Sequence, residues 1–410
     1  MTLALEAVRA WDRDDPLAHF KARFALPEGV IYLDGNSLGP PPLSARERVT
    51  AVVGEEWGEG LIRSWNEADW ISAPARVGSK IARLIGAGAD EVIVADSTSV
   101  NLFKLLTAAL LARPGRGVIL TETGNFPTDL YVAGGAAGMV PGATVRAVAP
   151  DDVEGAIDEE TAVVLLTQVH YKTAARRDMI RLTAAAHAAG ALMLWDLSHS
   201  AGAVAIDLGA CDADLAVGCG YKFLNGGPGA PAFLFIARRL QEDMRSPLTG
   251  WMGHAAPFDF SDVYRPAAGV GRFLAGTPPI LGLAALEAGI DLALEADAVA
   301  LEAKSARLWR LFTDLMAERH GDAFRLITPA DPAARGSHVS YAHPDGYAIM
   351  QALIARGVIG DFREPDVLRF GLTPLYLTFE DIWGAVEILG EVMAAETWRS
   401  IPPRAPGRVT

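Results

Sequence analysis

The stretch ALMLWDLSHSAGAVAIDLGACDADLAVGCGYKFLNG, residues 191–226, contains two short apolar segments, ALMLW and DLAVGCG, and polar residues follow each of them. Short segments that are apolar throughout, without alternating polar positions, are typical of strands buried on both faces of a parallel sheet. Asp196 directly follows the first segment, and Lys222 follows the second. The stretch therefore predicts two buried strands with a carboxylate and an amine at their carboxyl ends.

The same alternation of apolar segments and helix-like segments extends to both sides of this stretch. It predicts strands over 91–95, 117–121, 162–167, 191–195 and 213–219, and helices over 99–112, 127–138 and 177–189. Strands that alternate with helices form a mostly parallel sheet covered by helices on both faces. We therefore expect an α/β fold.

From about residue 275 the pattern changes to one long Ala/Leu/Glu-rich helix, 280–317, followed by shorter elements. These are a strand in HVSYAH (338–343), a helix in DGYAIMQALIARG (345–357), a strand in VLRFGL (367–372) and a final helix near 379–396. We expect an N-terminal segment, 1–45, that packs on the small domain and the active site. A large domain, 46–285, and a smaller α+β C-terminal domain, 286–410, would follow, with their boundary inside the long helix.

Composition limits the possible partners and the compartment. Half of the 410 residues are hydrophobic and the net charge is −14, which argues against nucleic acid or an anionic membrane as a partner. The N-terminus, MTLALEAVRAWDRDD, becomes charged too early for a signal peptide, and no run of 18 apolar residues occurs. Cys211 and Cys219, the two cysteines, form neither a metal-ligand pattern nor a disulfide framework, so we expect no metal and a cytoplasmic location.

Ligands of open α/β sheets bind at the carboxyl ends of the strands, so the residues there are candidate site residues. After the first predicted strand, Ser97–Ser99 open a helix, where hydroxyls and free backbone N–H groups can hold a phosphate. An ordinary helix cap without a ligand remains the alternative. Asp196 and His199 can likewise be structural, whereas a hydrolase triad through Ser198 is disfavoured because no G-x-S-x-G elbow occurs.

Lys222 is the most informative of these residues. Only six of the 36 basic residues are lysines, so a lysine at a strand end is less readily explained as incidental. A partly desolvated lysine forms a Schiff base, which arginine does not. Lys172 is a rival, although it lacks the glycine-rich turn behind Lys222, and a surface lysine beside a turn is the structural alternative.

Together, these residues fit one cofactor. Pyridoxal 5′-phosphate needs a lysine for its aldehyde, a carboxylate for its ring nitrogen and an anion site for its phosphate. Lys222, Asp196 and Ser97–Ser99 supply these groups at successive strand ends.

Along nearly its whole length the sequence also resembles the kynureninase family of pyridoxal-phosphate enzymes. The matching motifs are YLDGNSLGPPP (32–42), STSVNLFK (97–104), NFPTDLY (125–131), WDLSHSAGAVAIDL (195–208), GCGYKFLNGGPG (218–229), GWMGH (250–254), FLAGTPPIL (273–281) and LRFGLTPLY (368–376). The resemblance implies the aminotransferase-like fold (fold type I), with a seven-stranded sheet in the large domain. It also implies a homodimer with shared active sites.

The resemblance assigns roles to individual residues. Lys222 would bind the cofactor aldehyde, Asp196 would pair with the ring nitrogen, and Tyr221 would contact the phosphate and donate protons, so these three are the catalytic candidates. The remaining cofactor contacts would be Thr98, Ser99, Phe126, Pro127, Thr128, Asp129, Thr167 and His199, with Trp251 and Thr277 from the second subunit. Substrate would meet Arg369 through its carboxylate, Trp65 through its aryl group, and Asn36 and Ser37 from the N-terminal loop.

The activity implied is hydrolytic cleavage of the Cβ–Cγ bond of L-kynurenine, or of 3-hydroxykynurenine, in tryptophan catabolism and NAD biosynthesis. The products would be anthranilate, or 3-hydroxyanthranilate, and L-alanine. The nearest alternative is a cysteine desulfurase or selenocysteine lyase of the same fold, but that chemistry needs a cysteine in the small domain, and 330–370 contains none. A transaminase or a non-catalytic scaffold are further alternatives, which an anthranilate assay and a cofactor absorbance band would distinguish.

Overall fold

The computed structural model describes residues 4–403, which divide into two compact units. Within the described residues, the first unit takes in the chain up to Ser44, residues 172–176, and the chain from Leu292 on. The second unit consists of residues 45–171 and 177–291. Among the described residues, no helix has both the length and the apolar character needed to cross a membrane.

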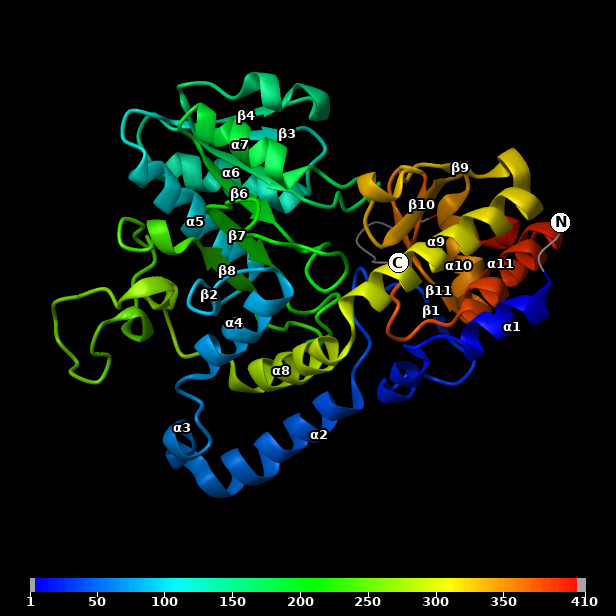
Figure 1. Ribbon diagram of the computed structural model, residues 1–410, viewed down its shortest axis with the longest axis horizontal. Coiled ribbons are helices and arrows are strands. Elements are labelled where there is room, and N and C mark those ends of the chain that lie inside the picture. The colour runs from blue at the N-terminus through cyan, green and yellow to red at the C-terminus, as the bar shows by residue number, and fades with distance from the viewer. Residues whose placement is uncertain (1–3, 404–410) are drawn as a thin grey trace. The chain divides into compact units, whose positions relative to one another are not determined.

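The second unit is built on a seven-stranded sheet in the order β2-β8-β7-β6-β5-β3-β4 (Figure 1). Only β8 runs antiparallel to its neighbours in this sheet. The prediction of a mostly parallel seven-stranded sheet is therefore confirmed. The strands are β2 (Val92–Val94), β3 (Val118–Glu122), β4 (Thr144–Val148), β5 (Thr161–Thr167), β6 (Leu192–Asp196), β7 (Leu215–Gly218) and β8 (Phe233–Ile236).

Helices cover both faces of this sheet. Leu194 and its neighbours on one face pack with α5 (Thr98–Ala112) and α6 (Pro127–Met139) in one buried cluster. On the other face, the indole of Trp195 donates to Thr183 of α7 (Met179–Ala188) at 3.2 Å. The alternation of side chains along a strand thus accounts for the two-sided burial that the apolar segments predict. The other helices of this unit are α2 (Leu43–Ala51), which continues as a π-helical stretch (Val52–Gly60), α3 (Ser64–Glu67), α4 (Ala73–Leu84) and α8 (Ile280–Glu295).

Two features differ from the sequence-based expectation. Strands β4 and β8 were not expected; β4, at the sheet edge, is only partly buried, so its sequence lacks a continuous apolar run. The predicted single helix over 280–317 is wrong, because α8 ends at Glu295 and α9 (Ala298–His320) begins after Asp297, whose side chain accepts a hydrogen bond from Ala300 N. An aspartate N-cap of this kind starts a new helix.

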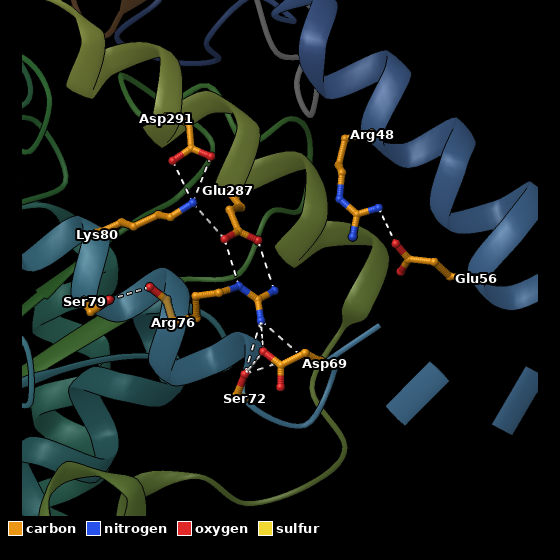
Figure 2. A network of polar contacts seen from close by, with 9 residues as sticks. All are labelled: Arg48, Glu56, Asp69, Ser72, Arg76, Ser79, Lys80, Glu287 and Asp291. Atoms are coloured by element: carbon orange, nitrogen blue, oxygen red, sulfur yellow. Dashed lines mark hydrogen bonds and ion pairs between the residues drawn. The ribbon is translucent and has the colours of Figure 1, made fainter. Parts of the chain in front are cut away.

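Ion pairs fasten α8 to α4 (Figure 2). Glu287 of α8 accepts from Arg76 Nε and from Lys80 Nζ, both at 2.9 Å, and Asp291 pairs with Lys80 at 2.7 Å. Because these side chains are partly exposed, each pair contributes only about 0–1 kcal/mol. The network therefore serves mainly to fix where α8 lies on the second unit.

The first unit contains an antiparallel sheet in the order β12-β13-β10-β9 and a parallel pair, β1-β11. One apolar cluster, which includes Phe312, Tyr376 and Phe379, forms its core. The strands are β1 (Ile31–Tyr32), β9 (Arg325–Leu326), β10 (His338–Ala342), β11 (Val358–Ile359), β12 (Asp361–Arg363) and β13 (Val367–Gly371). The helices are α1 (Leu5–Arg13), α9, α10 (Gly346–Ala355) and α11 (Phe379–Ala394).

Candidate active site

A cavity of about 270 Å³ lies in the second unit at the carboxyl ends of the sheet strands. This is the place where open α/β sheets bind ligands. The lining residues are Thr98, Ser99, Leu102, Phe126, Thr128, Asp129, Thr167, Tyr171, Asp196, Ser198, His199, Tyr221 and Lys222. Lys222 and Asp196 therefore line the same pocket, as the sequence predicts.

The turn that carries Lys222 depends on glycines at close backbone contacts. Gly226 N donates to Gly220 O at 2.9 Å, and Asn225 N donates to Lys222 O at 2.9 Å. A Cβ atom on Gly220 would lie 2.4 Å from the carbonyl oxygen of Pro231, which no larger residue tolerates. The glycine-rich turn thus fixes the backbone at Lys222, although the lysine side chain itself is flexible.

The amine of Lys222 lines the cavity beside three rings. Its Nζ lies 2.9 Å from His199 Nε2, 6.0 Å from the ring centre of Phe126 and 5.7 Å from that of Tyr221. In contrast, Lys80, Lys104 and Lys304 form ion pairs with carboxylates. The close contact of the Lys222 amine is thus with a histidine ring, while its charge also acts on Asp129 in the same cavity.

Two aspartates face one another in the cavity, and both are at most 3% exposed. Asp196 ends β6, and its Oδ1 accepts from Ser198 N at 2.7 Å. Burial, followed by the charge of Asp196, raises the pKa of Asp129 well above its usual range, although Lys222 acts in the opposite direction. A carboxyl group that keeps its proton beside a second carboxylate can donate a hydrogen bond to it.

The start of α5 faces the same cavity. Ser97 is the N-cap, and its hydroxyl accepts from Val100 N at 3.4 Å, so Thr98 and Ser99 are the first helical residues. Thr98 Oγ1 is buried without a hydrogen-bond partner among the described residues. Backbone N–H groups, a hydroxyl in need of a partner and the positive end of a 15-residue helix together suit a bound anion.

Asn125, which was not a predicted site residue, holds two lining residues in place. Its Oδ1 accepts from Thr167 Oγ1 at 2.6 Å and from Phe126 N at 2.7 Å. Asn125 is only 2% exposed and does not line the cavity itself, so it acts by holding Phe126 and Thr167, which do. Asn125 precedes Phe126 in the motif NFPTDLY, but its contact with Thr167 joins segments 42 residues apart, which no local pattern shows.

Other predicted residues lie outside the cavity lining. Pro127 begins α6, while Trp251 and Thr277 are exposed. Trp65 packs edge-to-face against Trp70, with ring centres 5.9 Å apart. Three lining residues had not been predicted: Leu102, Tyr171 and Ser198. Of these, Tyr171 gave the clearest signal, because it lies four residues after the end of the expected strand 162–167 and its neighbour Lys172 was weighed as a rival amine.

The predicted substrate residues Arg369, Ser37 and Asn36 belong to the first unit. Arg369 of β13 is 1% exposed; its Nε donates to Asp361 Oδ1 at 2.6 Å, and its Nη2 donates to Ser37 Oγ at 3.0 Å and to Asp361 Oδ2. Asn36 approaches Gly371 so closely that a Cβ there would lie 2.3 Å from Asn36 Oδ1. The structure therefore brings these three residues together.

Comparison with known proteins identifies the family. The chain is 52% identical over 396 residues to the kynureninase of Pseudomonas fluorescens, covering 95% of each chain. It is 50% identical over 402 residues to that of Burkholderia mallei, covering 96% of this chain and 97% of the relative. A family model described as the kynureninase C-terminal domain matches residues 301–389. The chain belongs to the kynureninase family.

Several solved structures share the fold of this chain, although their sequence identity to it is low. A cysteine desulfurase from Escherichia coli matches with a TM-score of 0.78 at 22% identity, covering 92% of this chain and 98% of the other. A mutant of a cystine C–S lyase, with glycine covalently linked to its PLP cofactor, matches with a TM-score of 0.77 at 18% identity, covering 90% and 99%. These neighbours confirm the predicted fold class.

The cysteines do not fit desulfurase chemistry. Cys211 and Cys219, the two cysteines of the sequence, are both buried, and burial raises the pKa of the Cys211 thiol to about 11. A thiol with such a pKa is almost wholly protonated at neutral pH and is a poor nucleophile. The likeness to desulfurases is therefore one of fold.

Proposed function

We propose that the chain is a kynureninase that uses pyridoxal 5′-phosphate to hydrolyse the Cβ–Cγ bond of L-kynurenine, releasing anthranilate and L-alanine. The observation that carries this proposal is the near-full-length identity of about half of the residues to kynureninases from two bacterial genera. Water supplies the atoms that the bond cleavage requires, so no oxidant or reductant is needed.

The residues of the cavity fit this cofactor. Thr98 Oγ1 and Asp129 Oδ2 are buried polar atoms without a hydrogen-bond partner among the described residues, and both residues line the cavity. Thr98 and Ser99 would hold the phosphate, Phe126 would stack on the ring, and Asp196 would hold a proton on the ring nitrogen. When bound, the cofactor supplies an aldehyde for the substrate amine and a protonated ring that accepts electrons from the substrate carbon.

Lys222 is the proposed covalent anchor and proton carrier. Its amine would bind the cofactor aldehyde and, once the substrate amine replaces it, carry the proton of the substrate α-carbon. The 2.9 Å contact with His199 Nε2 holds the amine inside the cavity. The role suits a lysine, because its amine gains and loses protons more readily than a guanidinium.

Tyr221 is the proposed proton donor. Burial, together with Cys219 and Asp196, raises the pKa of its phenol well above the usual range. The hydroxyl therefore keeps its proton at neutral pH and is suited to donate a hydrogen bond or a proton. A phenol in this state can donate a hydrogen bond to the cofactor phosphate. It can also donate a proton to the substrate Cβ when the Cβ–Cγ bond breaks.

Each unit contributes proposed substrate residues. Arg369, with Ser37 and Asn36 beside it, is the proposed site for the α-carboxylate, since a guanidinium binds carboxylates through two parallel hydrogen bonds. We propose Trp65 as the wall for the aryl group.

We also propose a homodimer in which Trp251 and Thr277 of one subunit complete the phosphate pocket of the other. The segment 251–264 supports this, because Phe258, Phe260 and Val263 each expose more than 60% of their surface. Several large apolar side chains exposed close together mark an interaction surface. Sedimentation of the holoenzyme tests the proposal, and a monomer at micromolar concentration contradicts it.

A cytoplasmic location, a role in tryptophan breakdown and a supply of precursors for NAD biosynthesis complete the proposal. Two buried thiols without a disulfide support a reducing compartment. The pathway is inferred from the name kynureninase that the relatives carry.

The deciding experiment mixes purified protein and cofactor with L-kynurenine and, separately, with 3-hydroxykynurenine. We expect anthranilate or 3-hydroxyanthranilate, with one equivalent of L-alanine. The Lys222→Ala variant serves as the negative control. Absence of both aromatic products with either substrate would overturn the proposed function.

A further inference from the structure

Lys104 is a fully buried lysine that the proposed reaction does not use. It lies in α5 with 0% exposure, and its Nζ donates to the carbonyl oxygen of Phe273 at 2.6 Å and forms an ion pair with Asp96. Burying an ammonium group is strongly unfavourable unless it is well paired. A lysine at this position therefore needs a specific reason, because an apolar residue packs in a helix at lower cost.

Its first partner, Asp96, forms the turn that leads into the proposed phosphate site. Asp96 follows β2 and has a φ of 47°, in the left-handed region that non-glycine residues seldom adopt. Its carbonyl oxygen accepts from Ala232 N at 2.9 Å. Such a conformation persists when the surroundings hold it, and here the ammonium group of Lys104 holds the side chain.

The direction of this turn sets where the next residues point. Ser97 caps α5, and Thr98 and Ser99 then face the cavity. If the Asp96 side chain loses its partner, the strained turn can relax, and the N–H groups and hydroxyls of Thr98 and Ser99 no longer converge.

The second partner, Phe273, links Lys104 to another segment of the same proposed pocket. Phe273 ends a short 3₁₀ turn, Gly269–Phe273, and is itself fully buried. Four residues later comes Thr277, the residue that we propose for the phosphate pocket of the second subunit. The ammonium group of Lys104 thus contacts the residues that precede two proposed phosphate-binding segments. One segment carries Thr98 and Ser99, and the other carries Thr277.

We propose that Lys104 is a positioning residue for the cofactor phosphate, which acts by holding the Asp96 turn and the Phe273 carbonyl. The inference rests on the proposed placement of the phosphate at Thr98 and Ser99, and not on the reaction that follows.

The test compares two ligands that differ only in the phosphate. Apoprotein is titrated with pyridoxal 5′-phosphate and with pyridoxal, and the absorbance of the lysine adduct is followed. In Lys104→Met we expect the affinity for the phosphorylated cofactor to fall about 10- to 100-fold, as for one or two lost charge-assisted hydrogen bonds. The affinity for pyridoxal should stay within about twofold, because the ring contacts do not depend on the turn.

Two further variants make the test specific. The double variant Asp96→Asn/Lys104→Met removes the carboxylate left without its partner and should show the same selective loss, even if the single variant folds poorly. Lys80→Met removes a lysine that is ion-paired on α4 and should change neither affinity. As a second readout, inorganic phosphate should raise the Tm of the wild-type and Lys80→Met apoproteins, but not that of the Lys104 variants.

The outcomes separate the two levels of the argument. Equal losses for both ligands, or no loss for either, in the Lys104 variants would overturn the positioning role while leaving the phosphate site intact. If the wild type itself binds pyridoxal as tightly as the phosphorylated cofactor, the proposed phosphate placement and the role of Lys104 are both overturned. Neither result bears on whether kynurenine is the substrate.

Discussion

Each unit of the protein contains a pair of closely placed aspartates, and the two pairs differ in the cations beside them. In the second unit, Asp129 and Asp196 share the cavity with Lys222. In the first unit, Asp361 is paired with Arg369 and with Arg363, the latter at 2.7 Å, and the charge of Asp361 acts on Asp34.

In both pairs one carboxyl group is held in its neutral form at higher pH than usual. Burial, followed by the charge of Asp361, raises the pKa of Asp34 to about 7. Burial works to raise the pKa of Asp361 as well, but Arg369 and Arg363 outweigh it and lower that pKa to about 2. Two arginines, whose charge is permanent, thus fix one acid as a carboxylate, and its neighbour Asp34 becomes the titrating group.

The contrast indicates what each cluster can do. An arginine cluster binds anions but neither forms a Schiff base nor gives up a proton, so the first unit is equipped for recognition. The amine of Lys222 lies 2.9 Å from His199 Nε2, in a cavity that it shares with Asp129 and Asp196, and an amine can form a Schiff base, which suits the second unit to the covalent role that we propose. Substitutions that exchange or neutralise these charges test this division of roles.

The largest effect is expected from Lys222→Arg. The variant keeps the positive charge but loses the amine, so anthranilate production should fall at least about 10³-fold and the absorbance of the cofactor adduct should disappear. Both quantities are measured in a spectrophotometer. The matched control is Lys172→Arg, since Lys172 is the rival amine of the sequence analysis; activity retained in the Lys222 variant but lost in the control would reverse the assignment.

The next effect concerns the two acids of the cavity. Asp196→Asn should lower kcat about 10²- to 10³-fold, because an amide does not hold a proton on the ring nitrogen. Asp129→Asn should lower it less than about tenfold, because burial and Asp196 already keep Asp129 protonated and an amide preserves a donor.

Steady-state kinetics on the two variants decide between the roles of these acids. Equal losses would show that both carboxylates act as charged groups. If kcat falls more in Asp129→Asn than in Asp196→Asn, then Asp129 is the acid that must be ionised and Asp196 is the one that can be neutral.

The sequence predicts the second unit better than the first, and the reason is physical. Buried parallel strands are apolar throughout, so their ends, and with them Asp196 and Lys222, can be read from local patterns. The partly exposed edge strand β4 and the break between α8 and α9 gave no comparable signal.

Contacts between distant segments also leave no local trace. Asn125 reaches Thr167 across 42 residues, and Ser37 donates to Asp361 at 2.6 Å across 324 residues. The motifs that resemble a family supplied Ser37 and Arg369 as candidates, but the acids that surround them, Asp34 and Asp361, became visible only in the folded chain.

A moderate effect is expected from Arg369→Lys. Lysine keeps the charge but not the planar fork, so KM for kynurenine should rise about 10- to 100-fold while kcat changes by less than about fivefold. Such a split, measured by initial rates, is the signature of lost ground-state binding. A fall in kcat with unchanged KM would instead place Arg369 outside substrate recognition. Arg363→Lys, on the neighbouring strand, is the matched control and should change KM less.

The smallest effect is expected from Asp34, through pH. Ionised Asp34 adds a negative charge beside Arg369, so the affinity for a carboxylate ligand should fall about three- to tenfold as the pH rises through about 7. The ligand for this measurement is the desamino analogue of kynurenine, because it has no amine that titrates. Calorimetry between about pH 6 and about pH 8 brackets the pKa. In Asp34→Asn the affinity should stay constant.

Stability gives an independent check of the same titration. The pKa of Asp34 in the folded protein, about 7, lies above the value of about 3.9 for an unfolded aspartate. The folded protein therefore binds more protons between these two pH values, and the free energy of unfolding contributed by this group falls as the pH rises through that window. Urea unfolding of wild type and Asp34→Asn at about pH 4 and about pH 7 should show the variant gaining stability relative to wild type at the higher pH. If the difference between the two proteins is the same at both pH values, Asp34 titrates normally, and the first unit then contains two ordinary carboxylates balanced by two arginines.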